Sequence, residues 1–87
     1  MTKIWAKLMK DEKIQKNIVY IVENQFTYSQ MQNYLFDICE KLDIASPILV
    51  KNHIFHLAKF NFVKFVQRDF MDSISFDSFI LEFISEK

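Results

Sequence analysis

The sequence predicts a small α+β domain in which two helices cover one face of an antiparallel sheet. Three observations lead to this class: alternating apolar residues at the start of the chain, two helical patterns in its middle, and short aromatic segments near its end. Because the chain has 87 residues, we expect a single domain over residues 1–87. The expected order is an N-terminal β-hairpin, two α-helices, and one or two short strands that complete the small antiparallel sheet, with the helices on one face.

The first two strands are predicted from two different patterns. In residues 3–9, apolar side chains occupy every second position, as in a half-buried strand. Residues 14–22 are rich in β-branched and aromatic residues, and the unbroken apolar run at 18–22 predicts a central, buried strand. The chain contains no Gly, so a tight turn between these strands must place Asp or Asn at positive φ.

The first helix is predicted over residues 28–42. Thr27 is a suitable N-cap and Gln30 completes a capping box, while Phe26 and Met31 have the spacing of a hydrophobic staple. Apolar residues then recur at spacings of three and four, which indicates one buried helix face.

A second helix is predicted to begin at Ser46 and Pro47, with Ser46 as the N-cap and Pro47 at the first helical position. We expect it to end near residues 58–60. Its expected apolar arc consists of Val50, Ile54, Leu57 and Ala58.

The last third of the chain contains two further candidate strands. Residues 62–66 are short, aromatic and β-branched, and residues 67–73 are expected to be irregular with one turn near Phe70. Residues 78–85 favour a strand, with a short helix as the alternative. Because helices on one side leave the other sheet face in water, we expect that face to expose apolar side chains. The candidates for exposure are Trp5, Met9 or some of Phe79, Leu81 and Phe83.

Composition and charge argue against several functions and compartments. Eleven basic and eleven acidic side chains give no net charge, which argues against bulk attraction to nucleic acid or an anionic membrane. Without Gly, glycine-rich phosphate loops and dinucleotide fingerprints cannot form. No signal-peptide pattern is present, and the apolar run at 18–22 is far shorter than the roughly 18 residues of a membrane span. A single Cys39 cannot form an internal disulfide, so we expect a reducing, cytoplasmic location.

Few side chains have the pattern of a catalytic or metal site. Cys39 falls on the apolar face of the first predicted helix, where we expect it to behave as a buried hydrophobe. His53 and His56 are spaced to approach one metal ion, but no further ligand pattern supports such a site. A chain of this length also has little room for a pocket of several hundred cubic ångströms. We therefore expect a non-enzymatic protein, with no catalytic residue, cofactor or metal ligand.

Residues 51–68 carry four cations and no acid, interleaved with aromatic residues. Proteins that bind single-stranded nucleic acid use this combination to stack bases and neutralise phosphates. The single Arg in the chain is a poor basis for phosphate forks and base recognition, so nucleic acid is the less favoured partner. The candidate nucleic-acid-binding residues are Lys51, Lys59, Lys64 and Arg68.

Two surface patches are predicted to bind a protein partner. On the second helix, a spacing of four residues places Phe55 between two cations, near Ile48. On the open sheet face, Trp5 is the largest apolar side chain. Aromatic residues rimmed by charge are typical of interface hot spots. The predicted partner-binding residues are therefore Ile48, Lys51, Phe55, Lys59 and Trp5.

Three segments of the chain follow a pattern found elsewhere: the opening strand at residues 3–7, the segment 42–53, and the tail 69–77 with the apolar end that follows it. In these segments the chain resembles a family of small, functionally uncharacterised proteins from low-GC Gram-positive bacteria. The resemblance implies a strand in the last segment. It implies no activity, substrate or catalytic residue.

These features predict a small cytoplasmic module that acts by protein–protein surface recognition, without contact with a membrane. The identity of the protein partner is not predicted, and a homodimer is one form that the interaction can take. A narrower hypothesis is an inhibitor, encoded by a phage or mobile element, that binds a host defence protein. The alternative function is nucleic-acid binding by the stretch 51–68.

Overall fold

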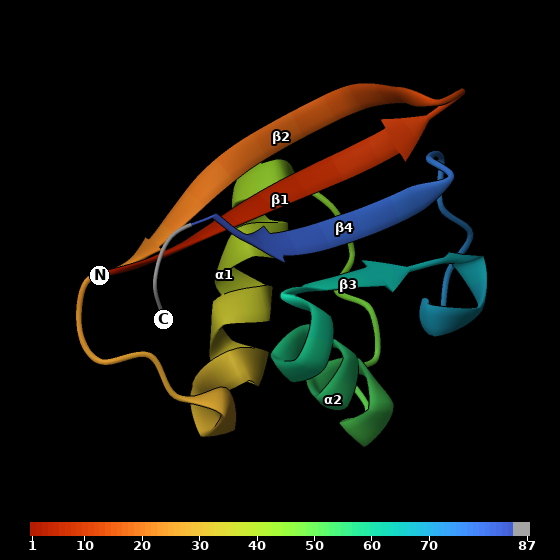
Figure 1. Ribbon diagram of the computed structural model, residues 1–87. Helices are drawn as coiled ribbons and strands as arrows, with labels where there is room; N and C mark the ends of the chain where they lie inside the picture. The colour runs from red at the N-terminus through yellow and green to blue at the C-terminus, as the bar shows by residue number, and fades with distance from the viewer. Residues whose placement is uncertain (85–87) are drawn as a thin grey trace.

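A computed structural model, which describes residues 1–84, confirms the predicted α+β class (Figure 1). It contains the N-terminal hairpin, two α-helices and a four-stranded antiparallel sheet, together with two 3-10 turns. In chain order the elements are β1 (Thr2–Lys10), β2 (Lys13–Val22), η1 (Tyr28–Gln30), α1 (Met31–Leu42), α2 (Lys51–Phe60), β3 (Phe62–Phe65), η2 (Gln67–Asp69) and β4 (Ser78–Phe83).

The strand order in the sheet is β2-β1-β4-β3, and every neighbouring pair is antiparallel. The last strand of the sequence therefore lies between β1 and β3, which confirms a strand over 78–83 instead of the alternative helix. Residue 85, the end of the predicted segment, lies outside the described residues. The prediction that 18–22 is a central strand was wrong, because β2 forms an edge of the sheet.

The hairpin turn uses two residues with positive φ, Asp11 at 53° and Glu12 at 65°. Positive φ at both central positions is the geometry of the type I′ turn, which matches the twist of the flanking strands. The Asp77 carboxylate accepts a hydrogen bond from the Asp11 backbone N–H at 2.8 Å and ties the turn to the segment before β4. A bulge between the pairs Leu8–Lys16 and Met9–Ile14 leaves Gln15 as the extra residue.

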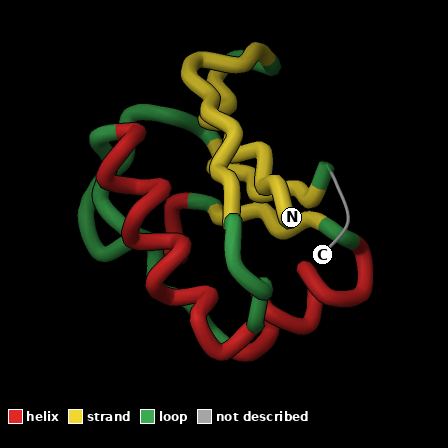
Figure 2. Tube along the Cα trace, turned by 90° about the vertical axis from the view of Figure 1, so that its left-hand side faces the viewer, coloured by secondary structure: helices red, strands yellow, loops and turns green. Residues whose placement is uncertain are grey.

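The hydrophobic core lies between the sheet and the two helices, which are on the same side of the sheet (Figure 2). Register decides which strand residues reach it: Ala6 lies opposite Leu81, and Leu8 lies opposite Phe79. Directly opposed residues share a face. The expectation that Phe79, Leu81 or Phe83 lies on the open face was therefore wrong, since all three are buried beneath the helices.

Helix α1 has the predicted apolar stripe, but its N-terminus differs from the prediction. The buried residues are Met31, Leu35, Ile38, Cys39 and Leu42. Thr27 precedes a 3-10 turn and makes no side-chain cap, so the predicted capping box does not form. The Phe26 ring instead stacks on Tyr34, with 5.3 Å between ring centroids, and meets Phe83 edge-on at 5.2 Å.

Helix α2 begins later than predicted, at Lys51 instead of Pro47, and ends at Phe60 as expected. The Ile48 backbone N–H donates to the Asp69 carbonyl at 2.7 Å, which holds the preceding segment against η2 and outside the helix. Of the predicted apolar arc, Leu57 is buried, Ile54 is partly buried, and Val50 and Ala58 are exposed. Within the described residues, neither helix has the length and apolarity needed to cross a lipid bilayer.

Candidate interaction surface

The sheet face opposite the helices carries Trp5 at its centre. Trp5 on β1 lies opposite Val19 on β2 and Glu82 on β4, and Glu82 lies opposite Phe62 on β3. These four side chains form one row across the whole sheet. Successive residues of a strand point to opposite faces. Because Ile4 and Ala6, on either side of Trp5, are in the core, the whole row lies on the open face.

Polar contacts hold the Trp5 ring in place on this face. The indole Nε1–H donates to Asn17 Oδ1 at 3.1 Å, and Lys7 Nζ lies 4.0 Å from the ring centroid. Lys7 also forms an ion pair with Glu82, with 3.0 Å between Nζ and Oε1. The cation–π contact with Lys7 and the hydrogen bond to Asn17 restrict the ring to one orientation.

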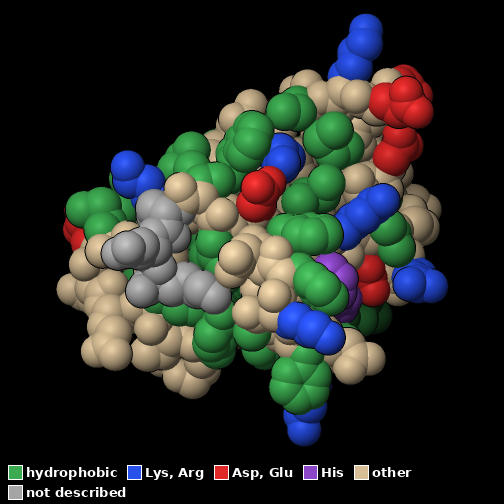
Figure 3. Space-filling model, in the orientation of Figure 1, with side chains coloured by type: hydrophobic (Ala, Val, Ile, Leu, Met, Phe, Trp, Pro, Cys, Tyr) green, Lys and Arg blue, Asp and Glu red, His purple; other side chains and the backbone are tan. Residues whose placement is uncertain are grey.

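Further apolar side chains surround this row. Strand alternation places Ile14, Val19, Ile21, Phe62 and Ile84 on the open face, each 40–48% exposed. In the space-filling view, hydrophobic side chains lie over the strands with basic and acidic side chains between them (Figure 3). Several neighbouring exposed apolar side chains, with charged side chains among them, are typical of a binding face on a soluble domain.

The second predicted patch, on α2, is also exposed. Phe55 is 62% and Ile48 is 51% exposed, and Lys51 and Lys59 are in water as well. The aromatic contact of Lys59 Nζ is with the Phe60 ring, 5.3 Å from the centroid. This patch lies on α2 in the helix layer, whereas Trp5 lies on the open face of the sheet. The structure therefore does not join the predicted partner-binding residues into one surface.

The four candidate nucleic-acid residues are also divided between surfaces. Lys51 and Lys59 are on α2, Lys64 is on the open face of β3 between buried Val63 and Phe65, and Arg68 is in η2. The structure therefore places two of these cations in the helix layer and one on the opposite side of the sheet.

Both histidines have structural partners. His53 Nδ1 accepts the Val50 backbone N–H at 3.0 Å, and its Nε2 lies 3.4 Å from Asp69 Oδ1. His56 Nδ1 lies 2.9 Å from the Phe62 carbonyl oxygen. His53 thus caps the start of α2 and links it to η2. In the part of the chain that the structure describes, no group of three or more His, Cys, Asp or Glu side chains is placed to hold a metal ion.

Cys39 is buried in α1, as predicted. Burial raises the pKa of its thiol from 9.0 to about 11, although a hydrogen bond with Ser46 acts in the opposite direction. At neutral pH the side chain is therefore a protonated thiol, and the thiolate needed for nucleophilic attack is scarce.

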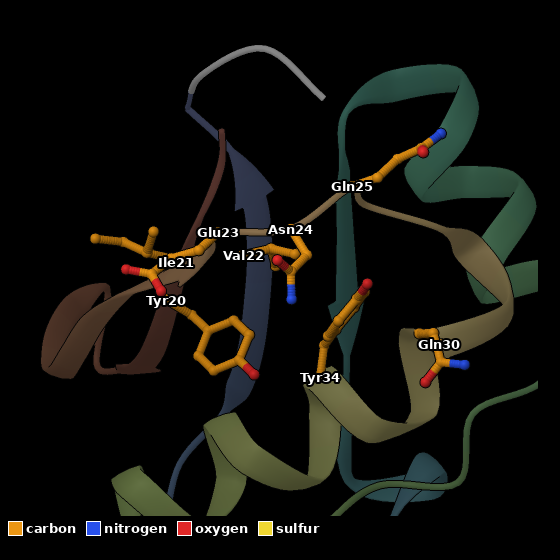
Figure 4. Close-up of a pocket in the computed structure, with 8 residues that line it drawn as sticks. All are labelled: Tyr20, Ile21, Val22, Glu23, Asn24, Gln25, Gln30 and Tyr34. Carbon is orange, nitrogen blue, oxygen red and sulfur yellow. The ribbon is translucent and has the colours of Figure 1, made fainter.

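A hollow of about 430 Å³ lies between the end of β2 and the start of α1, which corrects the expectation of little room for a pocket. Tyr20 on β2 and Tyr34 on α1 line it, with Asn24 on the connecting segment (Figure 4). The Tyr20 hydroxyl donates to Asp37 Oδ2 at 2.7 Å. Burial, followed by this hydrogen bond and the Asp37 charge, raises the pKa of Tyr20 to about 12, so its hydroxyl stays neutral at physiological pH.

Sequence reasoning identified Trp5 but missed most of the side chains around it. Val19 and Ile21 lie in an apolar run that was interpreted as a central, buried strand. Phe62 and Ile80 lie in aromatic segments without clear alternation, so their faces were not assigned. The signal that identifies them is the pairing register with β1, which no single strand contains.

Comparison of the chain with protein-family models, curated proteins and solved structures finds no match in any of the three.

Proposed function

We propose that the protein is a non-enzymatic interaction module that binds a protein partner through the open face of its sheet. The observation that carries this proposal is the Trp5 row with its apolar surroundings, which no described element covers. A surface of this kind loses water favourably when a second molecule packs against it.

The fixed orientation of Trp5 supports a role as the anchor of the interface. Its indole N–H bonds to Asn17 and its ring lies beneath the Lys7 ammonium, so the side chain is ordered before a partner arrives. Binding then loses little side-chain entropy, which favours affinity. Tryptophan is also among the residues that contribute most to binding energy in protein interfaces.

The charges on this face indicate the chemistry of the partner. Among the described residues of the four strands, Lys3, Lys7 and Lys64 lie on the open face together with the acid Glu82, which is already paired with Lys7. The fitting partner is therefore a protein with an apolar patch bordered by acidic side chains. Charge complementarity of this kind fixes the orientation of the complex and speeds its formation.

A comparison of two aromatic truncations tests this proposal. Trp5→Ala removes the centre of the open face, whereas Phe55→Ala removes an exposed ring from α2 and serves as the matched control. Each tagged variant, checked for folding by its thermal melt, is used to capture proteins from lysate with and without nuclease. We expect one nuclease-resistant protein that Trp5→Ala loses by at least tenfold and Phe55→Ala retains.

Other outcomes of the same experiment reject the open face. If Phe55→Ala abolishes capture and Trp5→Ala does not, the partner binds the α2 patch. If capture depends entirely on nucleic acid and falls steeply with salt, the alternative function of the stretch 51–68 replaces this proposal. The narrower hypothesis, an inhibitor of a defence protein, additionally requires that the captured protein lose its own activity in the complex.

A further inference from the structure

One edge of the sheet, along β2, carries backbone groups that point into solvent. Their direction follows from the other side of β1, where the Ile84 backbone N–H donates to the Lys3 carbonyl at 3.1 Å. In an antiparallel sheet, a residue directs its N–H and C=O to the same neighbouring strand, and successive residues alternate. The odd-numbered residues of β1 therefore bond to β4, and its even-numbered residues bond to β2.

The same alternation holds along β2. Ile4 and Ala6 of β1 lie opposite Tyr20 and Ile18, so these residues of β2 bond inward. The residues between them direct their N–H and C=O groups away from the sheet, where no described element pairs with them (Figure 1). These outward residues are Asn17, Val19 and Ile21.

The second half of this edge lacks the devices that usually protect an edge strand. Natural sheets use short edge strands, proline, charged side chains or bulges for this purpose. The other edge, β3, has four residues, whereas β2 has ten. The bulge and the lysines of β2 are confined to its first half, and residues 17–22 contain no charge and no proline. The second half of β2 is thus a template for a further strand.

We propose that two copies of this chain pair through their β2 edges, antiparallel, about a two-fold axis at Val19. Val19 of one copy then lies opposite Val19 of the other, and Asn17 lies opposite Ile21. The two four-stranded sheets join into one continuous sheet, with both Trp5 faces on the same side. A two-fold interface requires a surface that is complementary to itself, and an antiparallel strand pair meets this requirement.

The charges along β2 are self-complementary in this arrangement. The strand carries Lys13 and Lys16 near its start, and acids lie just outside it, at Glu23 after its end and at Asp11 and Glu12 in the turn before it. Antiparallel pairing places the basic start of each copy against the acidic end of the other. This charge pattern selects a second copy over an unspecified extended peptide as the occupant of the edge.

The bulge makes the expected position of Lys13 specific. Lys13 lies opposite Lys10 of β1, five positions from the level at which Trp5 and Val19 are paired. Five positions in the other direction lead past the end of β2 at Val22 to Asn24, where the chain bends. Lys13 of each copy therefore lies just beyond the last paired residue of the other copy, beside its residues Glu23 and Asn24.

The hollow between β2 and α1 is at this position. Its eight lining residues include Asn24 and Glu23 but no Lys, Arg or His. At its margin the Asp37 carboxylate accepts the hydrogen bond from Tyr20. The ammonium group of Lys13 from the second copy thus meets an acidic hollow whose lining, within residues 1–84, includes no cation.

A charge exchange tests the pairing directly. Sedimentation equilibrium gives the dimer dissociation constant of the wild type, of Lys13→Glu, of Glu23→Lys and of the double variant. We expect each single change to weaken the dimer on the order of tenfold, because it places like charges together at two symmetric positions, and the double variant to restore it. Lys51→Glu makes the same substitution on α2 and should leave the dimer unchanged. A wild type that is monomeric at all accessible concentrations, or a dimer that neither single change weakens, overturns the proposal.

A cross-link tests the register. Val19→Cys places two thiols opposite each other at the two-fold axis, within the Cα separation that a disulfide spans. Val50→Cys is the matched control, because Val50 and Val19 are 47% and 48% exposed. Mild oxidation should link Val19→Cys at least tenfold faster than Val50→Cys, while Cys39 stays buried and unreacted. Equal rates contradict pairing at Val19.

Because the dimer uses the β2 edge, Trp5→Ala should leave it intact, so this proposal and the proposed function can fail separately.

Discussion

The two faces of the sheet are built from alternate residues of the same four strands, and both carry apolar side chains, although the open face also carries charged ones. On the helix side, Ile4, Ala6 and Leu81 are fully buried, whereas Val19 and Ile21 on the open side are nearly half exposed. The more apolar face forms the core, but apolar side chains are not confined to it. The covered face is the one onto which two amphipathic helices fold, and the open face keeps its apolar side chains for contacts outside the domain.

The largest difference in stability between the two faces is expected from alanine substitutions at two neighbouring residues of β4. Leu81→Ala removes a fully buried side chain and leaves a cavity, so we expect a loss of about 3 kcal/mol in the free energy of unfolding. Ile80→Ala, the matched change on the open face, should lose about 1 kcal/mol or less. Urea unfolding measures both values. Equal losses would show that the open face is covered in solution.

The exclusion of water beneath the helices should also be visible in the pH dependence of stability. The raised pKa of Cys39 means that the folded state disfavours the thiolate. The protonated thiol therefore contributes to the free energy of unfolding. This contribution is fully present below pH 9 and is lost as the pH rises through about 11, with a total on the order of 2 kcal/mol. Urea midpoints between pH 8 and 10 should fall for the wild type more steeply than for Cys39→Val, in which this contribution is absent. Parallel curves would contradict a buried thiol.

The smallest effect should come from the ion pair on the open face. Glu82→Gln removes the charge that Lys7 pairs with, but the Glu82 side chain is 41% exposed. Solvent-exposed ion pairs contribute little, so we expect a loss below about 1 kcal/mol that decreases further at high salt. Thermal melts at two salt concentrations measure it. A larger loss, insensitive to salt, would indicate that Glu82 has a structural role beyond the pair.

Much of the fold was predictable because the strongest patterns are local. Alternation in β1, the stripe in α1 and the aromatic segment of β3 each appear within a few consecutive residues. The predicted caps failed at Thr27 and Ser46 for a different reason. At Ser46 a contact distant in sequence, between Ile48 and Asp69, held the backbone outside the helix. At Thr27 the chain forms a 3-10 turn, and aromatic packing around Phe26 accompanies it.

The candidate surface was also only partly predictable. Trp5 was identified from its place in an alternating strand, but the prediction placed Phe79, Leu81 and Phe83 on the wrong face. In β4 that set is wholly apolar and the other set contains Ser78, Ile80 and Glu82, so the strand pattern favours the first set inside, which the prediction did not use. Pairing with β1 establishes it, because Ala6 lies opposite Leu81.

The sequence by itself determined the class of the fold, the identity of most elements and the absence of glycine-dependent phosphate loops. These properties depend on residue type and on spacings of two to four residues, which act locally. Only the tertiary structure decided that β2 is an edge, that β4 is central and that Val19 and Ile21 face water. Strand order and register depend on hydrogen bonds between residues up to about 80 positions apart, such as Lys3 and Ile84. No local pattern contains that information.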